Sequence, residues 1–125
     1  MAGKIIADTL EHSTAGSVTT DYVVNGSVKS WANINQDTSG HPTRDSLNVS
    51  STSDSGAGST RFTVTSAMNN ENYAVLATCT VDTSYNQNSC AQEVTTTTYD
   101  LYNDDGAATN TDNPYGQVAV LGDLA

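Results

Sequence analysis

The search for catalytic chemistry in this chain begins with its two histidines. A nucleophilic side chain needs a base within hydrogen-bond reach, and the histidines are His12, in an irregular N-terminal stretch, and His41, beside Pro42 in a predicted loop. Neither lies in a recognisable catalytic motif, and we interpret both as exposed loop residues. The sequence therefore predicts no site for nucleophilic catalysis.

Carboxylates are more plentiful, with eleven Asp and three Glu in the chain. A pair of carboxylates can support glycoside hydrolysis, but most of the Asp residues lie where turns favour Asp. These positions are Asp37, Asp54, Asp82, Asp104, Asp105 and Asp112. Because turn formation accounts for them, the sequence predicts a protein that is not an enzyme and that has no cofactor.

A partial match to the calcium-binding loop lies near the end of the chain, starting at Leu101. The residues that fall at the third, fifth, sixth and twelfth positions of that pattern are Asn103, Asp105, Gly106 and Asp112. The first position should be acidic but is Leu101, and no flanking helices are predicted. We interpret the match as accidental and predict no metal site.

Cysteines and tyrosines supply the remaining candidates. Cys79 and Cys90 can pair across a predicted hairpin, or be two half-buried small residues; the lack of an export signal favours the second reading. Among the six tyrosines, Tyr85 at a predicted hairpin tip is the best candidate for an exposed ligand contact. Ligand contacts are therefore expected in the polar loops around Tyr85, Asp104 and Asp105.

The charge of the chain limits its partners. A net charge of −10 with only four basic residues argues against nucleic acid, whose phosphates require a cationic surface. It also disfavours an anionic membrane, and no segment approaches the ~18 apolar residues of a membrane span. The apolar run in the first residues is too short for a secretory signal, which indicates synthesis in the cytosol. An acidic surface suits a basic partner or neutral sugars.

The composition predicts an all-β protein with a thin core. Hydrophobic residues make up 36% of the chain, and there are 14 Ser, 19 Thr and 12 Asn. Thr, Val and Tyr favour half-buried strands, whereas Ser, Asn, Asp and Gly favour the turns between them. Association with other copies of the chain would supply part of the missing burial.

Hydrophobic alternation locates the strands that must carry these residues. Residues 1–21 show no sustained period and are predicted to form an extended N-terminal arm that docks elsewhere. Residues 22–125 are predicted to form one antiparallel β-sandwich or barrel-like domain of six to seven short strands, without a helix. The expected strands are Tyr22–Asn35 (whole, or split by a turn at Asn25-Gly26), TRDSLNVSS, TRFTVTS, YAVLATCTV, CAQEVTTTTYDLY and YGQVAVLGD. TRDSLNVSS and TRFTVTS form the clearest hairpin, and YAVLATCTV is apolar enough on both faces to be covered on both.

The stretch VNGSVKSWANINQ holds the only Trp in the chain, Trp31. Alternation places Trp31 on one strand face with Lys29 and Asn33, and Ala32 and Ile34 on the other. If Trp31 is exposed, it can serve as a platform for a ligand. If Trp31 is covered, it is a packing anchor within the domain or between copies of the chain. Because Trp31 is the largest apolar side chain in a chain short of apolar mass, we interpret it as a structural anchor.

The middle of the chain resembles a small β domain found in tail-fibre and other virion structural proteins of tailed phages, especially phages of aquatic bacteria. The resemblance is carried by VNGSVKSWANIN and by RDSLNVSSTSDSGAGSTRFTVTSAMNNENYAVLAT, and it covers about residues 23–81. Two positions depart from the pattern, since Ile34 and Leu47 stand where Phe is expected. Nothing transfers to the segment after Val81.

This resemblance implies a non-catalytic bacteriophage virion protein, made in the host cytoplasm and located on the particle surface. It also implies a homotrimer that attaches to other virion proteins, for which the arm is the candidate segment, and that contacts a host surface glycan. We rank a short tail-fibre or fibre-tip protein first and a capsid decoration protein, which the shortness of the chain favours, second. A carbohydrate-binding module without a viral role is the third alternative.

Overall fold

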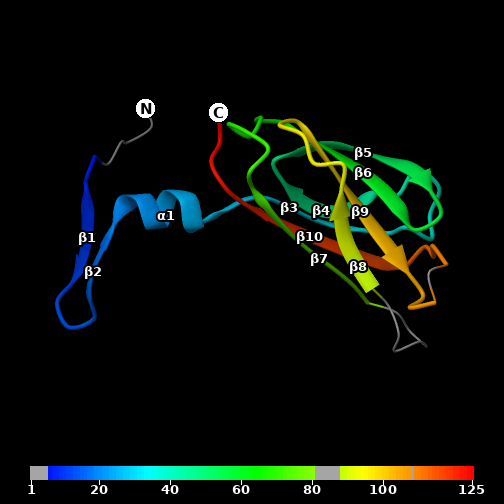
Figure 1. The fold of residues 1–125 in the computed structure, drawn as a ribbon, viewed down its shortest axis with the longest axis horizontal. Helices are drawn as coiled ribbons and strands as arrows, with labels where there is room; N and C mark the ends of the chain where they lie inside the picture. Colours follow the sequence, from blue (N-terminus) through cyan, green and yellow to red (C-terminus); the bar gives the residue numbers. More distant parts are fainter. Residues whose placement is uncertain (1–5, 81–87, 108) are drawn as a thin grey trace.

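The chain forms a two-layer antiparallel β-sandwich with a projecting N-terminal arm (Figure 1). The structure is a computed structural model, and it describes residues 6–80, 88–107 and 109–125. The two sheets have four strands each, and they pack face to face. The all-β, sandwich-like fold predicted from composition and alternation is confirmed.

The first sheet has the strand order β4-β3-β10-β7 and the second has β5-β6-β9-β8. The strands of the first sheet are β3 (Val28–Ile34), β4 (Thr43–Leu47), β7 (Ala74–Thr80) and β10 (Tyr115–Leu121). Those of the second are β5 (Val49–Gly56), β6 (Ser59–Val64), β8 (Asn88–Gln92) and β9 (Thr98–Asp104). The described part of the sandwich thus contains eight strands, because two of the predicted strands are each divided.

The first division occurs at Asn48, between β4 and β5. Asn48 has a φ of 56°, a left-handed conformation that Asn tolerates better than most residues, and its side chain accepts a hydrogen bond from Ser66 N at 2.7 Å. The chain therefore leaves one sheet and enters the other at this residue. The prediction that TRDSLNVSS forms one strand is wrong: Leu47 is 50% exposed on the first sheet, whereas Val49 packs against the core from the second. The predicted hairpin is present as β5 and β6.

The second division lies inside CAQEVTTTTYDLY. Glu93 has a φ of 47°, and the Thr95 hydroxyl accepts hydrogen bonds from the backbone N–H groups of Thr97 at 3.2 Å and Thr98 at 2.9 Å. A hydroxyl that satisfies the backbone two and three residues ahead stabilises a turn. The prediction of one continuous strand is therefore wrong, because the threonine run begins with a turn that separates β8 from β9.

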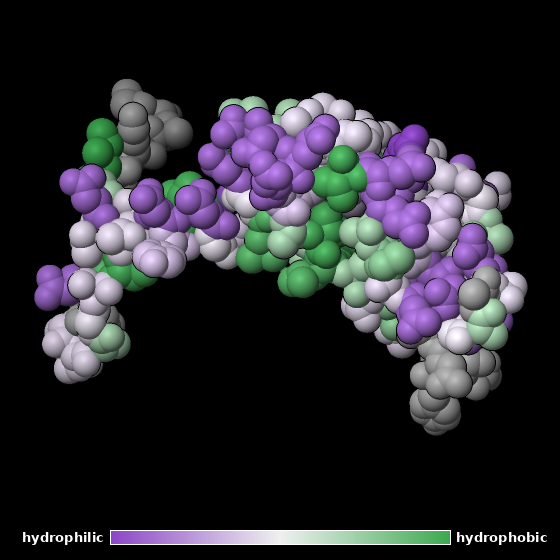
Figure 2. Space-filling model, viewed as in Figure 1, coloured by the Kyte–Doolittle hydropathy of each residue, from purple (hydrophilic) through white to green (hydrophobic). Residues whose placement is uncertain are grey.

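The arm comprises residues 6–26: a hairpin of β1 (Thr9–His12) and β2 (Gly16–Thr19), followed by the helix α1 (Thr20–Gly26). The prediction of a helix-free chain with a strand from Tyr22 is wrong, since the Asn25-Gly26 pair ends a helix instead of forming a hairpin turn. The arm extends beyond the expected boundary at residue 21, and it projects away from the sandwich, leaving an open concave side between the two (Figure 2). Across the described residues, no helix is both long and apolar enough to span a membrane.

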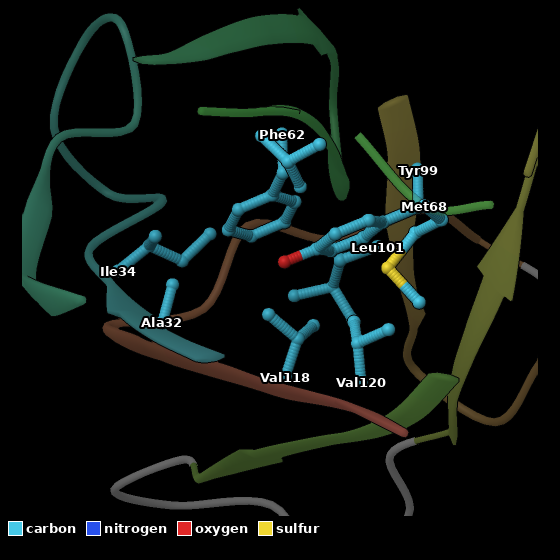
Figure 3. Close-up of a cluster of buried hydrophobic side chains, with 9 residues drawn as sticks. Ala32, Ile34, Phe62, Met68, Tyr99, Leu101, Val118 and Val120 are labelled. Atoms are coloured by element: carbon cyan, nitrogen blue, oxygen red, sulfur yellow. The ribbon is translucent and has the colours of Figure 1, made fainter. Parts of the chain in front are cut away.

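The core fills the space between the sheets (Figure 3). The rings of Phe62 and Tyr99 stack with their centroids 5.0 Å apart, and the Tyr99 hydroxyl is 3.0 Å from the Ser30 hydroxyl of the opposite sheet. The buried hydrophobic residues are Ala32, Ile34, Phe62, Val64, Met68, Tyr99, Leu101, Val118 and Val120. The core is small, as the composition predicts, and a hydrogen bond between the two sheets crosses it.

Candidate binding surface

Trp31 lies on the outer face of the first sheet, away from the core. Its neighbours Ser30 and Ala32 on β3 are buried, so the alternation predicted for this strand is confirmed. In the strand register, Trp31 stands opposite Leu47 of β4 on one side and Ala119 of β10 on the other, and Ala119 stands opposite Leu76 of β7. Apolar residues therefore form one continuous row across all four strands of this face.

Much of this row is accessible to solvent in the single chain. Leu76 is 61% exposed and Leu47 is 50% exposed, while Trp31 is half-buried. A pocket of about 220 Å³ is lined by Leu76, Ala119 and Gln117 among others. The expectation that β7 is covered on both faces is wrong for the isolated chain. The outer face of the first sheet is consequently the strongest candidate binding surface of the described residues.

Cationic side chains border the apolar row. The Lys29 ammonium donates hydrogen bonds to the Val24 carbonyl and to the Ser27 hydroxyl, at 2.6 Å in the second case. The Arg44 guanidinium lies over the ring of Tyr115, 4.4 Å from the ring centroid. Such a contact favours the cation without neutralising it, so this edge of the face keeps its positive charge. Trp31 and Lys29 do share a face, as the sequence predicted.

The opposite sheet has a different outer face. There Arg61 forms hydrogen bonds of 2.8 Å to both carboxylate oxygens of Asp100 and also pairs with Glu93. The hydrogen bonding that Arg61 donates to Asp100 is the main cause that raises the pKa of Arg61. The guanidinium is already occupied by the fold, which leaves this face without a free cation among the residues described.

A buried polar network lies at one end of the sandwich and contains the arrangement closest to a catalytic one. His41 Nδ1 is 2.7 Å from the Thr60 hydroxyl, and His41 Nε2 is 3.5 Å from Asp54 and 3.7 Å from Asp112. The Thr60 hydroxyl, the His41 imidazole and two carboxylates thus lie next to one another in space, in the order of a catalytic nucleophile, base and acid. However, Thr60 is 0% exposed and His41 is 1% exposed. No substrate can reach the hydroxyl, so the arrangement connects structural elements.

The prediction of an exposed His41 is therefore wrong. The reason is that loop 35–42 folds inward. There Gln36 Nε2 donates a hydrogen bond to the Thr60 hydroxyl at 3.0 Å, and Gln36 Oε1 accepts one from Asn103 Nδ2 at 2.6 Å. With the Gln36 amide donating to the Thr60 oxygen, the Thr60 proton is free to point to His41 Nδ1. The side chain of His12 lies outside the described residues.

The carboxylates proposed for ligand contacts already accept hydrogen bonds from other groups of the fold. Asp104 accepts hydrogen bonds from Asn88 Nδ2 at 3.0 Å and from Gly106 N at 2.7 Å. Asp105 accepts from the backbone N–H groups of Ala107 and Thr109, and these bonds hold the pKa of Asp105 below its ordinary value. Both side chains therefore stabilise the turn that follows β9, and their oxygens are already used as hydrogen-bond acceptors. Tyr85, the third candidate, lies outside the described residues.

The partial calcium-loop match does not converge on one point. Leu101 is fully buried in the core, and the Asn103 side chain is committed to the buried network with Gln36. Asp112 accepts a hydrogen bond from Gly58 N at 2.7 Å. Among the residues that the structure describes, no group of three His, Cys, Asp or Glu side chains is placed to hold a metal ion.

Cys79 and Cys90 are both free thiols. Cys79 lies on β7, which pairs with β10, whereas Cys90 lies on β8, which pairs with β9. The hairpin that was expected to bring them together is therefore not formed, because β7 and β8 belong to different sheets. Cys79 is half-buried, and Cys90 is exposed.

Two features of the site escaped sequence reasoning: the inward His41 loop and the apolar row that links four strands. The row joins residues from positions 31, 47, 76 and 119, and only the strand order brings them into line. The available signal was the apolar content of both faces of YAVLATCTV.

Comparison with known proteins found no matching family model, no matching curated protein and no matching solved structure.

Proposed function

We propose that this protein is a non-catalytic structural component of a bacteriophage virion, located on the particle surface as a short tail-fibre or fibre-tip protein. The observation that carries the proposal is the resemblance of residues 23–81 to virion β domains, in residue types that recur in order. The proposed state is a homotrimer, in which the exposed apolar row around Trp31 supplies burial that the thin core lacks.

The architecture supports this proposal on physical grounds. A compact sandwich carries an arm whose helix has no buried residue, and such a segment gains stability only when another surface covers it. Proteins that work inside an assembly have this division between a folded body and an attachment segment. The His–Thr arrangement and the loop carboxylates are occupied by structural hydrogen bonds, which favours a structural role over an enzymatic one.

The experiment that tests the proposal locates the protein on purified phage particles. Gold-labelled antibody and quantitative mass spectrometry would give its position and its copy number per particle. Tail or baseplate labelling at tens of copies or fewer is expected for a fibre. Hundreds of copies on the head would replace the fibre by the decoration protein, and absence from the particle would refute the virion role.

A carbohydrate-binding module without a viral role is tested separately. The isolated protein would be applied to a glycan array, with Asp104→Ala as the variant at the loop expected to contact ligand. Sugar binding that is lost in Asp104→Ala, together with absence from particles, would establish this alternative. A protein that binds no sugar and is found on particles excludes it.

A further inference from the structure

We propose that the arm of one copy, residues 6–26, packs against the outer face of the β4-β3-β10-β7 sheet of a second copy of the chain. Neighbouring copies would then be joined arm to sheet. The inference deepens the proposed function, on which it rests for its biological setting, by naming the surface that receives the arm.

The arm lacks the packing that would stabilise it alone. A single two-stranded hairpin is marginal in water, and so is a helix shorter than about 12 residues; α1 has seven. No residue of α1 is buried, and every residue of β2 is exposed. Ile6 is 82% exposed and Tyr22 is 74% exposed. The arm therefore presents an apolar surface that needs a cover.

Within residues 6–80, 88–107 and 109–125, nearly all of the exposed large hydrophobic residues fall into two groups. One group lies in the arm and consists of Ile6, Leu10, Val18, Tyr22, Val23 and Val24. The other lies on strands of the first sheet and consists of Val28, Leu47, Leu76 and Tyr115. Only Leu124 stands apart among the described residues, and the strands of the second sheet contribute none. Exposed apolar surface that gathers on one part of a molecule marks an interaction site, and exposed hydrophobic residues occur here both on the arm and on the first sheet (Figure 2).

The charges of the two surfaces are complementary. Residues 6–26 contain Asp8, Glu11 and Asp21 and no Lys or Arg. The strands of the first sheet contain Lys29 and Arg44 against a single acid, Asp45. In a chain of net charge −10, this sheet is the element of the described structure with an excess of cations, which suits an acidic segment. Opposite charges at an interface fix orientation and suppress wrong contacts.

The arm is also as long as one side of an ordinary interface. The described arm has 21 residues, from 6 to 26, and each side of a standard protein interface contributes about 20–30 residues. The pocket of about 220 Å³ beside Leu76 and Ala119 can receive one apolar side chain from the arm.

The edge of the receiving sheet also requires protection. β7 is an edge strand of seven residues, AVLATCT, with no charge, no proline and no bulge in its pairing with β10. Natural proteins protect such edges because they template unwanted pairing. An arm that lies over Leu76 would cover this edge together with the apolar row.

A second copy is the partner because the junction directs the arm away from its own sheet. The Lys29 ammonium donates to Val24 and Ser27 at the end of α1, and the arm leaves the sandwich in that direction (Figure 1). Both complementary surfaces nevertheless lie on one chain. A contact between two different surfaces of identical chains closes into a ring when the rotation allows it, which is compatible with the proposed trimer.

The test measures the mass of the full-length chain in solution by sedimentation velocity. Leu76→Asp alters the receiving face, Val23→Asp and Leu10→Asp alter the arm, and Ser53→Asp is the control on the exposed surface of the second sheet. The natural chain is expected to assemble at micromolar concentration. The face and arm variants should raise the dissociation constant roughly tenfold or more, with unchanged circular dichroism, and Ser53→Asp should assemble normally.

Mixing the variants separates arm-to-sheet contact from sheet-to-sheet contact. Leu76→Asp retains an intact arm and Val23→Asp retains an intact face, so an equimolar mixture should form a complex of one of each. A monomeric natural chain would overturn the inference, as would loss of assembly in Leu76→Asp but in neither arm variant. A mixture that stays monomeric would overturn it too. None of these results bears on whether the protein is found on particles, which the proposed function requires.

Discussion

Replacing Gln36 with Leu should destabilise the sandwich through its hydrogen bonds. Gln36 is 2% exposed, and its side chain connects the loop after β3 with β6, β9 and the segment before β10. Its Oε1 accepts from Asn103 Nδ2 at 2.6 Å and from the Asn113 backbone N–H at 3.2 Å. Leu has a similar size but accepts no hydrogen bond, so the substitution removes the polar contacts without opening a large cavity.

The magnitude follows from the two donors that lose this acceptor. A buried donor left without a partner costs about 1–3 kcal/mol, so the free energy of unfolding should fall by about 2–6 kcal/mol. The added apolar burial offsets at most a part of this. Because small domains are stable by only about 5–15 kcal/mol, the change should be large enough to measure by urea unfolding.

Trp31 is the single tryptophan, and its fluorescence can follow that unfolding. Gln92→Leu is the matched control, because Gln92 is exposed at the end of β8 and surface substitutions usually change stability by about 0.5 kcal/mol or less. If Gln36→Leu unfolds within 0.5 kcal/mol of the natural chain, the network does not stabilise the sandwich and our reading of His41 and its neighbours is refuted.

Three further predictions follow from single residues. Trp31→Ala should lower the stability of the dilute chain by only about 0.4–2 kcal/mol, the worth of two cross-strand pairs, and it should weaken assembly further. Circular dichroism and sedimentation check both effects, and a variant that stays folded and assembled but loses binding of a ligand would restore the interpretation of Trp31 as a ligand platform. Burial raises the pKa of Tyr73 from 10.0 to about 12, so its contribution to stability is complete below pH 10 and is lost as the pH rises through about 12; alkaline unfolding should be less steep in Tyr73→Phe. Gly58→Ala should lower the free energy of unfolding by about 1–3 kcal/mol through backbone strain, because φ is +68°, and by more through a clash, because a Cβ would lie 2.3 Å from the Asn103 backbone oxygen. Gly40→Ala is the control: φ is +79° but no atom lies within 4 Å of its Cβ, so thermal unfolding should show a smaller loss.

The parts of the fold that the sequence predicted depend on local pattern. Alternation along β3 correctly separated Ala32 and Ile34 from Trp31, because successive side chains of a strand point to opposite faces. The hairpin of β5 and β6 was predicted because its turn is rich in Gly and Asp, residues that adopt turn conformations. The errors at Asn48 and Glu93 have the opposite origin. A single residue with positive φ divides an apparently continuous strand, and composition contains no signal for where that occurs.

The candidate surface required information that no local pattern contains. The sequence alone determined an acidic, all-β chain with a thin core, an N-terminal segment without the alternation of the rest, and a Trp on the strand face opposite to that of Ala32. Only the tertiary structure decided that β3 and β10 are central, that Leu47 and Leu76 align with Trp31, and that His41 turns inward. The reason is that alternation fixes which side of a strand a residue occupies, whereas strand order, set by packing between distant segments, fixes which residues become its neighbours.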